Sequence, residues 1–420
     1  MKELMALDPA AVRCPYPYFA KMRADSPVTW IDELGCFAVV RYQDILEVVR
    51  DTERFSSRMP TGPKAAADTF AVLQQLVSDG GASIEALAAG MGMASVSVLL
   101  SADPPSHDEQ RKLVSRAFTP RRVRDLEPRI REIAEDLVEG FVARGHCEFI
   151  SEFAVGLPLR VIAESLGVPP EDMAMFKRWS DDLTAVIGNH QMSADQLRRM
   201  LSAFVEFFAY FTERIVERRA APSEDLISAI VYSAAEGERP LSDPEMLAMF
   251  AQFLVAGNET TTKLLGSLLL LLLEQPELLA ALRADSSKIP QLVEETLRLE
   301  SPVQGLFRVA NVDTEVGGVS VRAGSSLWVI YASGNRDAEE FTCPDVADLE
   351  RANSRSHLAF GNGVHYCLGA ALARAEARIG LEVILERLDD LALDGEADLL
   401  YERSYVLHGL RQLPITFRRR

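Results

Sequence analysis

Apolar residues recur at three- and four-residue steps over a charged opposite face in the longest patterned stretches of the chain. This spacing is typical of amphipathic helices. It predicts helices over Val123–Ala143, Leu197–Arg219, Asp243–Glu274 and Ala370–Leu388. The pair Asp243-Pro244 marks the start of the third helix, because an N-cap residue is followed by proline at the first helical position.

Strand patterns are few and short. The candidates are Val28–Ile31, Phe37–Val40, Val319–Val321 and Leu327–Ile330. They predict small antiparallel sheets, and the lack of regular strand–helix alternation argues against a dinucleotide-binding or barrel fold. No repeat and no Pro/Gly/Ser linker divides the chain. The expected fold class is therefore mainly α with small antiparallel β-sheets, in one domain over residues 1–420.

The most apolar stretch is Leu264–Leu273, bounded by Lys263 and Glu274. It has about half of the ~20 residues that a membrane span needs, so a buried helix is the better interpretation. The N-terminus has no apolar core of signal-peptide length. A net charge of -18 argues against nucleic-acid binding. These features predict a soluble, cytoplasmic protein without membrane insertion.

One of the five cysteines stands in an unusual setting. In the segment His357–Gly369, HLAFGNGVHYCLG, glycines surround Cys367 and would let the backbone approach a flat ligand. A strong helical pattern follows, so we expect Cys367 at a helix N-terminus, where the dipole and free N–H groups favour the thiolate that a metal ligand must be. The alternatives are a small buried apolar residue or a catalytic nucleophile.

The fixed positions around this cysteine resemble the haem-binding signature of the cytochrome P450 family, F-G-x-G-x-H-x-C-x-G. They are filled here by Phe360, Gly361, Gly363, His365, Cys367 and Gly369. The resemblance implies that Cys367 is the axial ligand of a haem b iron and that His365 contacts a haem propionate. It also implies a haem buried between two long helices. A thiolate ligand favours O–O cleavage.

A second motif, Ala256-Gly257-Asn258-Glu259-Thr260-Thr261, lies inside the long apolar helix. A glycine in a helix costs about 1 kcal/mol relative to alanine, and a buried glutamate costs more unless it is paired. Ala256 and Gly257 would let a flat ligand or dioxygen approach, and Glu259 with Thr260 resembles the acid–alcohol pair that relays protons in the family. The alternative is a polar kink.

Glu295 and Arg298 share one helix face at i, i+3 spacing and can therefore pair. Such a pair alone has little specificity. The resemblance implies that Arg351 joins them to lock the core behind the haem, although Ala347 stands where the family often has an aromatic residue. The implied role is structural.

The segment Asp103–Arg111 resembles the DPPxHxxxR entry to a helix in the same family. His107 and Arg111 are one turn apart and face one way. The resemblance implies that both bind haem propionates by charge-assisted hydrogen bonds, together with Arg308. His357 is a further expected neighbour of the haem. The alternative for each of these residues is a surface ion pair.

The resemblance implies a monooxygenase that inserts one atom of O2 into a hydrophobic molecule such as a terpenoid, steroid, fatty acid, aromatic compound or natural-product intermediate. Electrons would come from NAD(P)H through a separate ferredoxin and ferredoxin reductase, with the basic segment Arg111–Arg131 as a docking face or as an ordinary solvated helix. We expect a monomer. The rivals are a peroxide-driven peroxygenase and a haem sensor or carrier without turnover, and Glu259-Thr260 argues against both.

The resemblance also suggests which segments line the substrate pocket, and these are mostly apolar. They are residues 80–100, part of 181–192, Phe253, Ala256, Val303–Phe307 and Tyr405–Leu407.

Overall fold

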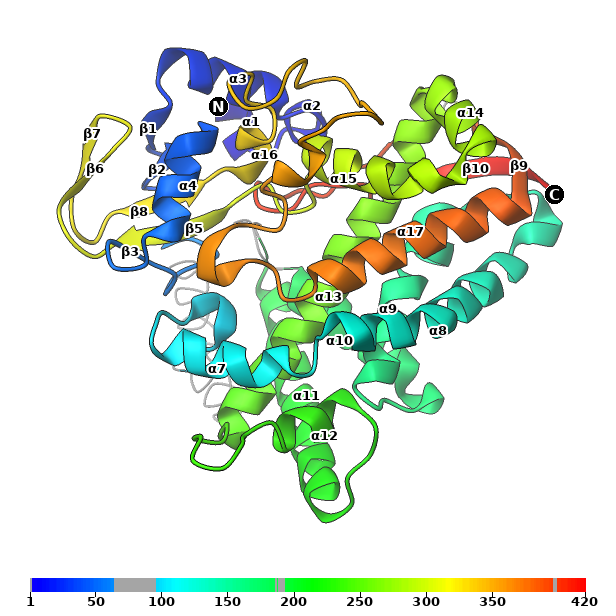
Figure 1. Ribbon diagram of the computed structural model, residues 1–420, viewed down its shortest axis with the longest axis horizontal. Coiled ribbons are helices and arrows are strands. Elements are labelled where there is room, and N and C mark those ends of the chain that lie inside the picture. The colour runs from blue at the N-terminus through cyan, green and yellow to red at the C-terminus, as the bar shows by residue number, and fades with distance from the viewer. Residues whose placement is uncertain (1, 64–95, 186, 188–192, 396–398) are drawn as a thin grey trace.

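A computed structural model describes residues 2–63, 96–185, 187, 193–395 and 399–420. Helices dominate the described part of the chain (Figure 1). They are α1 (Lys2–Met5), α2 (Pro9–Arg13), α3 (Tyr16–Asp25), α4 (Tyr42–Arg50), α7 (Ser106–Ser115), α8 (Pro120–Glu139), α9 (Gly156–Ser165), α10 (Met173–Thr184), α11 (Ala194–Ala220), α12 (Leu226–Val231), α13 (Asp243–Glu274), α14 (Pro276–Ala284), α15 (Ile289–Leu299), α16 (Tyr331–Gly334) and α17 (Ala370–Arg387).

Helices α8, α11, α13 and α17 confirm the four periodic stretches, with ends that differ by at most four residues. The cap of α13 was misassigned by one residue. Ser242 is the N-cap, and its hydroxyl and the Glu245 carboxylate accept each other's backbone N–H groups in a capping box. Asp243 is instead the first helical residue and pairs with Arg219 of α11. A serine with a glutamate three residues later satisfies two N–H groups, which Asp243 alone would not.

The strands form three small sheets. They are β1 (Val28–Ile31), β2 (Cys36–Val39), β3 (Phe55–Ser56), β4 (His146–Glu148), β5 (Leu306–Ala310), β6 (Thr314–Val316), β7 (Val319–Val321), β8 (Ser326–Val329), β9 (Leu388–Leu393) and β10 (Pro414–Arg419). The largest sheet has the order β1-β2-β8-β5-β3, and the others are β4-β10-β9 and β6-β7. All pairs are antiparallel except β2 with β8, which run parallel.

Helix α13 runs through the middle of the molecule, between the sheet side and the helical side (Figure 1). Its first half packs Phe250, Phe253 and Leu254 into a cluster with α10 and α11. Its second half packs leucines against α8, α15 and α17. The apolar run therefore lies inside the protein. No single described helix is long and apolar enough to cross a membrane, and α13 with α14 passes that test only as a pair bent by 101°.

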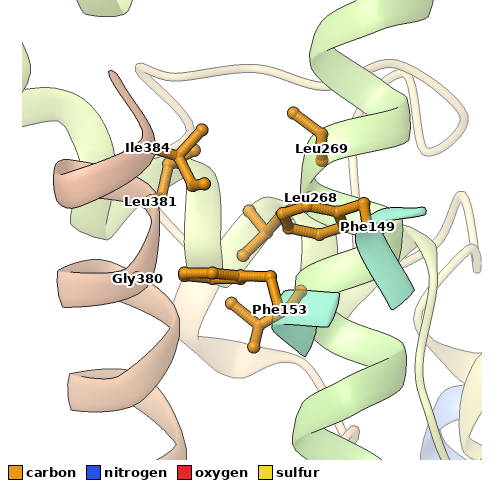
Figure 2. Close-up of a pocket in the computed structure, with 8 residues that line it drawn as sticks. Phe149, Phe153, Leu268, Leu269, Gly380, Leu381 and Ile384 are labelled. Carbon is orange, nitrogen blue, oxygen red and sulfur yellow. The ribbon is translucent and has the colours of Figure 1, made fainter. Parts of the chain in front are cut away.

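A small cavity of about 10 Å³ lies where α13 and α17 meet the short π-helix η3 (Ile150–Ala154). Figure 2 shows its wall of leucine, isoleucine and phenylalanine side chains, with the rings of Phe149 and Phe153 facing α17. These two rings stack with centroids 5.2 Å apart. The cavity has about the room of one water molecule and no polar partner for it, so it is a dry packing gap.

Three fully or nearly buried charges tie α15 to the loop before the cysteine segment. Arg298 donates from Nε and Nη2 to the two carboxylate oxygens of Glu295, each at 2.9 Å. Arg351 donates from Nε to Glu295 Oε2 at 3.0 Å. Both guanidinium groups also donate to backbone carbonyls, including Pro344 and Val346. The sequence-predicted trio is thus brought together, and it fixes this loop on the core.

Glu295→Gln is expected to lower the free energy of unfolding by about 3–5 kcal/mol, because two buried guanidinium groups would lose the one carboxylate that pairs with them among the described residues. Urea unfolding followed by circular dichroism measures this. The matched control is Glu350→Gln in the same loop, whose exposed side chain pairs with Lys288 and whose loss should cost less than about 1 kcal/mol. Equal losses of stability in the two variants would contradict the role of Glu295 in fixing this loop on the core.

Candidate active site

The loop before α17 holds Cys367 through backbone geometry that glycine makes possible. Gly361 and Gly363 have φ of 68° and 71°, and a Cβ at Gly363 would come within 2.8 Å of a carbonyl oxygen of α4. The Cys367 N–H donates to the Phe360 carbonyl at 2.9 Å and closes the turn. Gly369 is the N-cap of α17, so the cysteine lies two residues before the cap.

The Cys367 thiol has a raised pKa, because burial outweighs the lowering effect of the Gly369 and Ala370 N–H groups and of Arg111 and Arg374. The N–H groups at the helix end do favour the thiolate, as the sequence predicts, but burial has the larger effect. A metal ion bound to the sulfur would favour the thiolate over the thiol. The side chain still keeps an exposed surface, and a Cβ at neighbouring Gly369 would meet no atom within 4 Å. The space beside the sulfur is open to a ligand.

A basic cluster lies next to this loop and draws on three parts of the chain. His107 from α7 and His365 from the loop have ring centroids 4.2 Å apart. Arg111, one turn along α7, donates to the Tyr366 carbonyl at 2.7 Å. Burial, and then the charges of Arg308 on β5, His107 and Arg111, lower the pKa of His365 to about 3. The potential here therefore disfavours further positive charge and favours an anion.

Arg308 shows what kind of ligand would fit. Its guanidinium is buried and donates to the Phe307 carbonyl at 2.8 Å. Within the described part of the chain, no carboxylate pairs with Arg308 or Arg111. A buried cation without a counter-charge is strongly unfavourable. The open sulfur and these uncompensated cations therefore fit a haem, whose iron would bind Cys367 and whose two propionates would reach the guanidinium groups.

His357 does not take part in this cluster. Its Nε2 lies 3.0 Å from Glu294 Oε2, and its Nδ1 accepts the Ala359 N–H at 3.2 Å. Both ring nitrogens are therefore engaged, and the expectation that His357 binds the haem is corrected. Glu294 also binds Arg374 of α17. Burial alone would raise the pKa of Glu294, but hydrogen bonds from His357 and Arg374 lower it to about 2. His357 thus braces the base of the cysteine loop.

On α13, the predicted acid and alcohol are adjacent but not bonded to each other. Thr260 Oγ1 donates to the Ala256 carbonyl at 2.8 Å, one turn back along the helix. Glu259 forms an ion pair with Lys263, one turn ahead. Ala256 is exposed although its helix crosses the core, and the nearest side chain to a Cβ at Gly257 is 3.7 Å away. This turn of the helix therefore has room for a ligand.

Part of the expected substrate lining can be placed. Phe253 is buried, with its ring centroid 5.3 Å from that of Phe118, and Val303 bridges to Leu407. Residues 80–95, 186 and 188–192 lie outside the described residues. The described residues of this set are mostly apolar, and the buried side chain of Gln304 is a polar exception.

Lys263 and Glu376 are among the buried charged residues that sequence reasoning missed. Lys263 was taken as the boundary of the apolar run, yet it is 1% exposed. Glu376 on α17 is buried and hydrogen-bonded to Thr261 of α13, and burial raises its pKa to about 8. Helical spacing places Glu376 on the same face as buried Gly380 and Ile379, so a helical projection of α17 would have revealed it.

Glu376→Gln is expected to remove a pH dependence of stability. Between about pH 4.5 and pH 8 the folded protein holds a proton on Glu376 that the unfolded chain has released, so the free energy of unfolding falls as pH rises through this range. The loss is on the order of 4 kcal/mol. Urea unfolding at pH 5, 6.5 and 8 should show a shallower fall for Glu376→Gln, but not for the control Glu386→Gln on the exposed face of α17. Parallel curves for all three proteins would exclude a buried protonated Glu376.

The comparisons with known proteins agree with this site. The family model described as Cytochrome P450 matches residues 170–407. Cytochrome P450 107B1 of Saccharopolyspora erythraea is 36% identical over 417 residues, which cover 98% of this chain and 97% of the relative. A steroid C26-monooxygenase of Mycobacterium tuberculosis is 34% identical over 397 residues, covering 94% of this chain and 98% of the relative.

The solved structures give the same picture. Cytochrome P450 CYP109Q5 from Chondromyces apiculatus has a TM-score of 0.85 and 39% sequence identity, over 99% of this chain and 98% of that chain. The similarity therefore extends over both the sheet side and the helical side of the fold.

Proposed function

The chain belongs to the cytochrome P450 family, and we propose that it inserts one oxygen atom of O2 into a hydrophobic small molecule, using electrons from a separate ferredoxin and ferredoxin reductase. As a member of this family it is a monooxygenase with haem b as its cofactor. The observation that carries the proposal is the open side of Cys367 together with the uncompensated guanidinium of buried Arg308, whose charge acts on His365 in the same loop.

Different residues would bind the iron, bind the propionates and transfer protons. When bound, haem b supplies the reductive activation of O2 and the transfer of one oxygen atom. Cys367 would hold the iron, and four residues would hold the propionates: His107, Arg111, Arg308 and His365. Glu259 and Thr260 on α13 would move protons toward the reacting oxygen. This proton-relay pair is the reason to prefer turnover driven by O2 over a sensor, a carrier or a peroxide-driven enzyme.

The substrate is proposed to be a largely apolar molecule. The described lining residues, such as Phe253 and Val303, offer contact area and few hydrogen-bonding groups. One relative is named a steroid C26-monooxygenase. Terpenoids, steroids, fatty acids, aromatic compounds and natural-product intermediates of similar polarity all match this chemistry.

Ferredoxin docking is proposed at a groove of about 310 Å³ between α8, α15 and α17. Arg374 links the groove to the cysteine loop, since its guanidinium lies 4.5 Å from the Phe360 ring centroid. Basic side chains outnumber acidic ones in the lining, which consists of Pro120, Val123, Arg124, Glu127, Pro290, Val293, Glu294, Arg355, Ala371, Arg374, Ala375 and Arg378. Such a surface attracts an acidic partner.

The basic segment of the sequence contributes less to this surface than its composition suggests. Lys112 and Arg116 pair with Glu238, and Arg131 pairs with two glutamates of α17. Among the described residues, Arg124 has no carboxylate partner. Cytoplasmic location is proposed because reduced nicotinamide cofactors and ferredoxins are available there.

The function is tested by the spectrum of the dithionite-reduced, carbon monoxide-bound protein. Wild type is expected to show the Soret band of a thiolate-ligated haem. Cys367→Ala is expected to lose this band, because no other described sulfur lies in this loop, and to keep the circular dichroism of a helical protein. Retention of the thiolate band in Cys367→Ala would overturn the assignment. Wild type should also oxidise lipophiles that shift its haem from low to high spin when given ferredoxin, reductase and NAD(P)H.

Arg124→Glu is expected to raise the apparent Kd for an acidic ferredoxin several-fold at low ionic strength, with the effect shrinking as salt is added. Stopped-flow reduction at increasing ferredoxin concentration measures it. The control is Arg322→Glu, which makes the same charge change at an exposed residue between β7 and β8, outside the groove. An equal change in both variants would place docking elsewhere.

A further inference from the structure

Lys263 is a buried cation shared by two carboxylates. It lies on α13, one turn after Glu259, and its side chain is 2% exposed. Its ammonium forms an ion pair with Glu259 and lies 3.7 Å from Glu402 Oε2. Lysine is almost never fully buried unless it is paired. The two acids are more open, with 21% and 31% of their side chains exposed. Glu259, Lys263 and Glu402 together form the α13 triad.

The C-terminal hairpin is shaped around this lysine. Tyr401 and Leu410 form a bridge, and the Glu402 N–H donates to the Gly409 carbonyl at 2.9 Å. A Cβ at Gly409 would lie 2.6 Å from Cβ and Cγ of Lys263, so only glycine leaves room for the lysine stem. The arm of the hairpin with Gly409 therefore leaves room for the lysine stem, and the arm with Glu402 brings its carboxylate toward the ammonium.

The triad bears on proton transfer because Glu259 is turned away from Thr260. It binds Lys263 ahead of it, and Thr260 binds the Ala256 carbonyl behind it. For Glu259 to act with Thr260, it must release the ammonium. A buried ammonium left without a partner is strongly unfavourable. Glu402, already 3.7 Å away, can keep that charge paired.

We propose that Lys263 is a positioning residue that holds Glu259 away from Thr260, and that Glu402 takes over the ammonium when Glu259 turns toward Thr260. This inference rests on the proposed function. A carboxylate that has lost its cation binds a proton more readily. Glu259, once released, would take a proton from solvent and donate it to Thr260 Oγ1, while the proton that Thr260 now donates to the Ala256 carbonyl passes toward the reacting oxygen.

A purely structural lysine, which only ties the hairpin to α13, predicts different behaviour. In that case Glu402→Gln leaves the product formed per NAD(P)H unchanged, and adding Lys263→Met brings no gain in it. Exchange of the ammonium between the two acids predicts that either acid can pair with Lys263 when the other is removed. It also predicts that Glu402 is no longer needed for proton delivery once Lys263 is removed.

The first test measures unfolding of the haem-loaded protein in urea. Glu402→Gln is expected to change the unfolding equilibrium constant less than about threefold when Glu259 is present. In a Glu259→Gln background, where Glu402 is the remaining carboxylate partner, the same change should raise that constant at least about tenfold. The control Glu277→Gln on α14 should have the same effect in both backgrounds. Equal effects of Glu402→Gln in the two backgrounds would overturn the exchange.

The second test measures product formed per NAD(P)H consumed, with surrogate ferredoxin and reductase and a lipophile that shifts the haem to high spin. Glu402→Gln is expected to lower this coupling several-fold, because Glu259 can no longer release the ammonium. Adding Lys263→Met should restore coupling to within about twofold of wild type. Arg403→Gln, an exposed charge on the same hairpin, should change nothing.

The outcomes separate the two proposals. If wild type lacks the thiolate spectrum or does not turn over, the proposed function fails. The role assigned to Lys263 and Glu402 is overturned, while the function stands, if wild type turns over but Glu402→Gln keeps full coupling. The same holds if Glu402→Gln with Lys263→Met forms no more product per NAD(P)H than Glu402→Gln alone.

Discussion

A charge that is buried must find its opposite inside the fold, and this constraint organises the protein around the Cys367 loop. Behind the loop the requirement is met within the chain: Glu295 satisfies Arg298 and Arg351 at 2.9–3.0 Å. In front of the loop it is left open, because buried Arg308 has no described carboxylate partner. The closed side makes a rigid base, and the open side makes a place for a dianionic ligand.

The same constraint operates along α13. A helix that is apolar on all sides can cross the core without difficulty, yet this one carries a buried lysine and a glutamate next to the predicted alcohol. The lysine is tolerated because two carboxylates approach it, one of them from a hairpin more than a hundred residues away in sequence. In the proposed exchange, either acid alone keeps the lysine paired in the fold, whereas proton delivery needs both acids.

The sequence was most informative where periodicity is strong or a motif is dense. The bounds of α13 were predicted correctly, and the four residues expected at the propionates do meet. His357, a further expected neighbour of the haem, does not join them. Strand β5 was missed because almost every residue in it is buried, so it shows no alternation. Local pattern also cannot show the partner of a residue. His357 was placed by proximity to the motif, whereas Glu294 on α15 decides its position.

The central claim is that the uncompensated cations beside Cys367 are completed by the propionates of a haem whose iron binds the sulfur. A crystal structure of the haem-loaded protein tests this most directly. Cys367 Sγ should be bonded to the iron, and propionate oxygens should lie within hydrogen-bonding distance of Arg308 and Arg111. A haem bound through another residue, or an Arg308 guanidinium that still lacks a carboxylate partner, would contradict it.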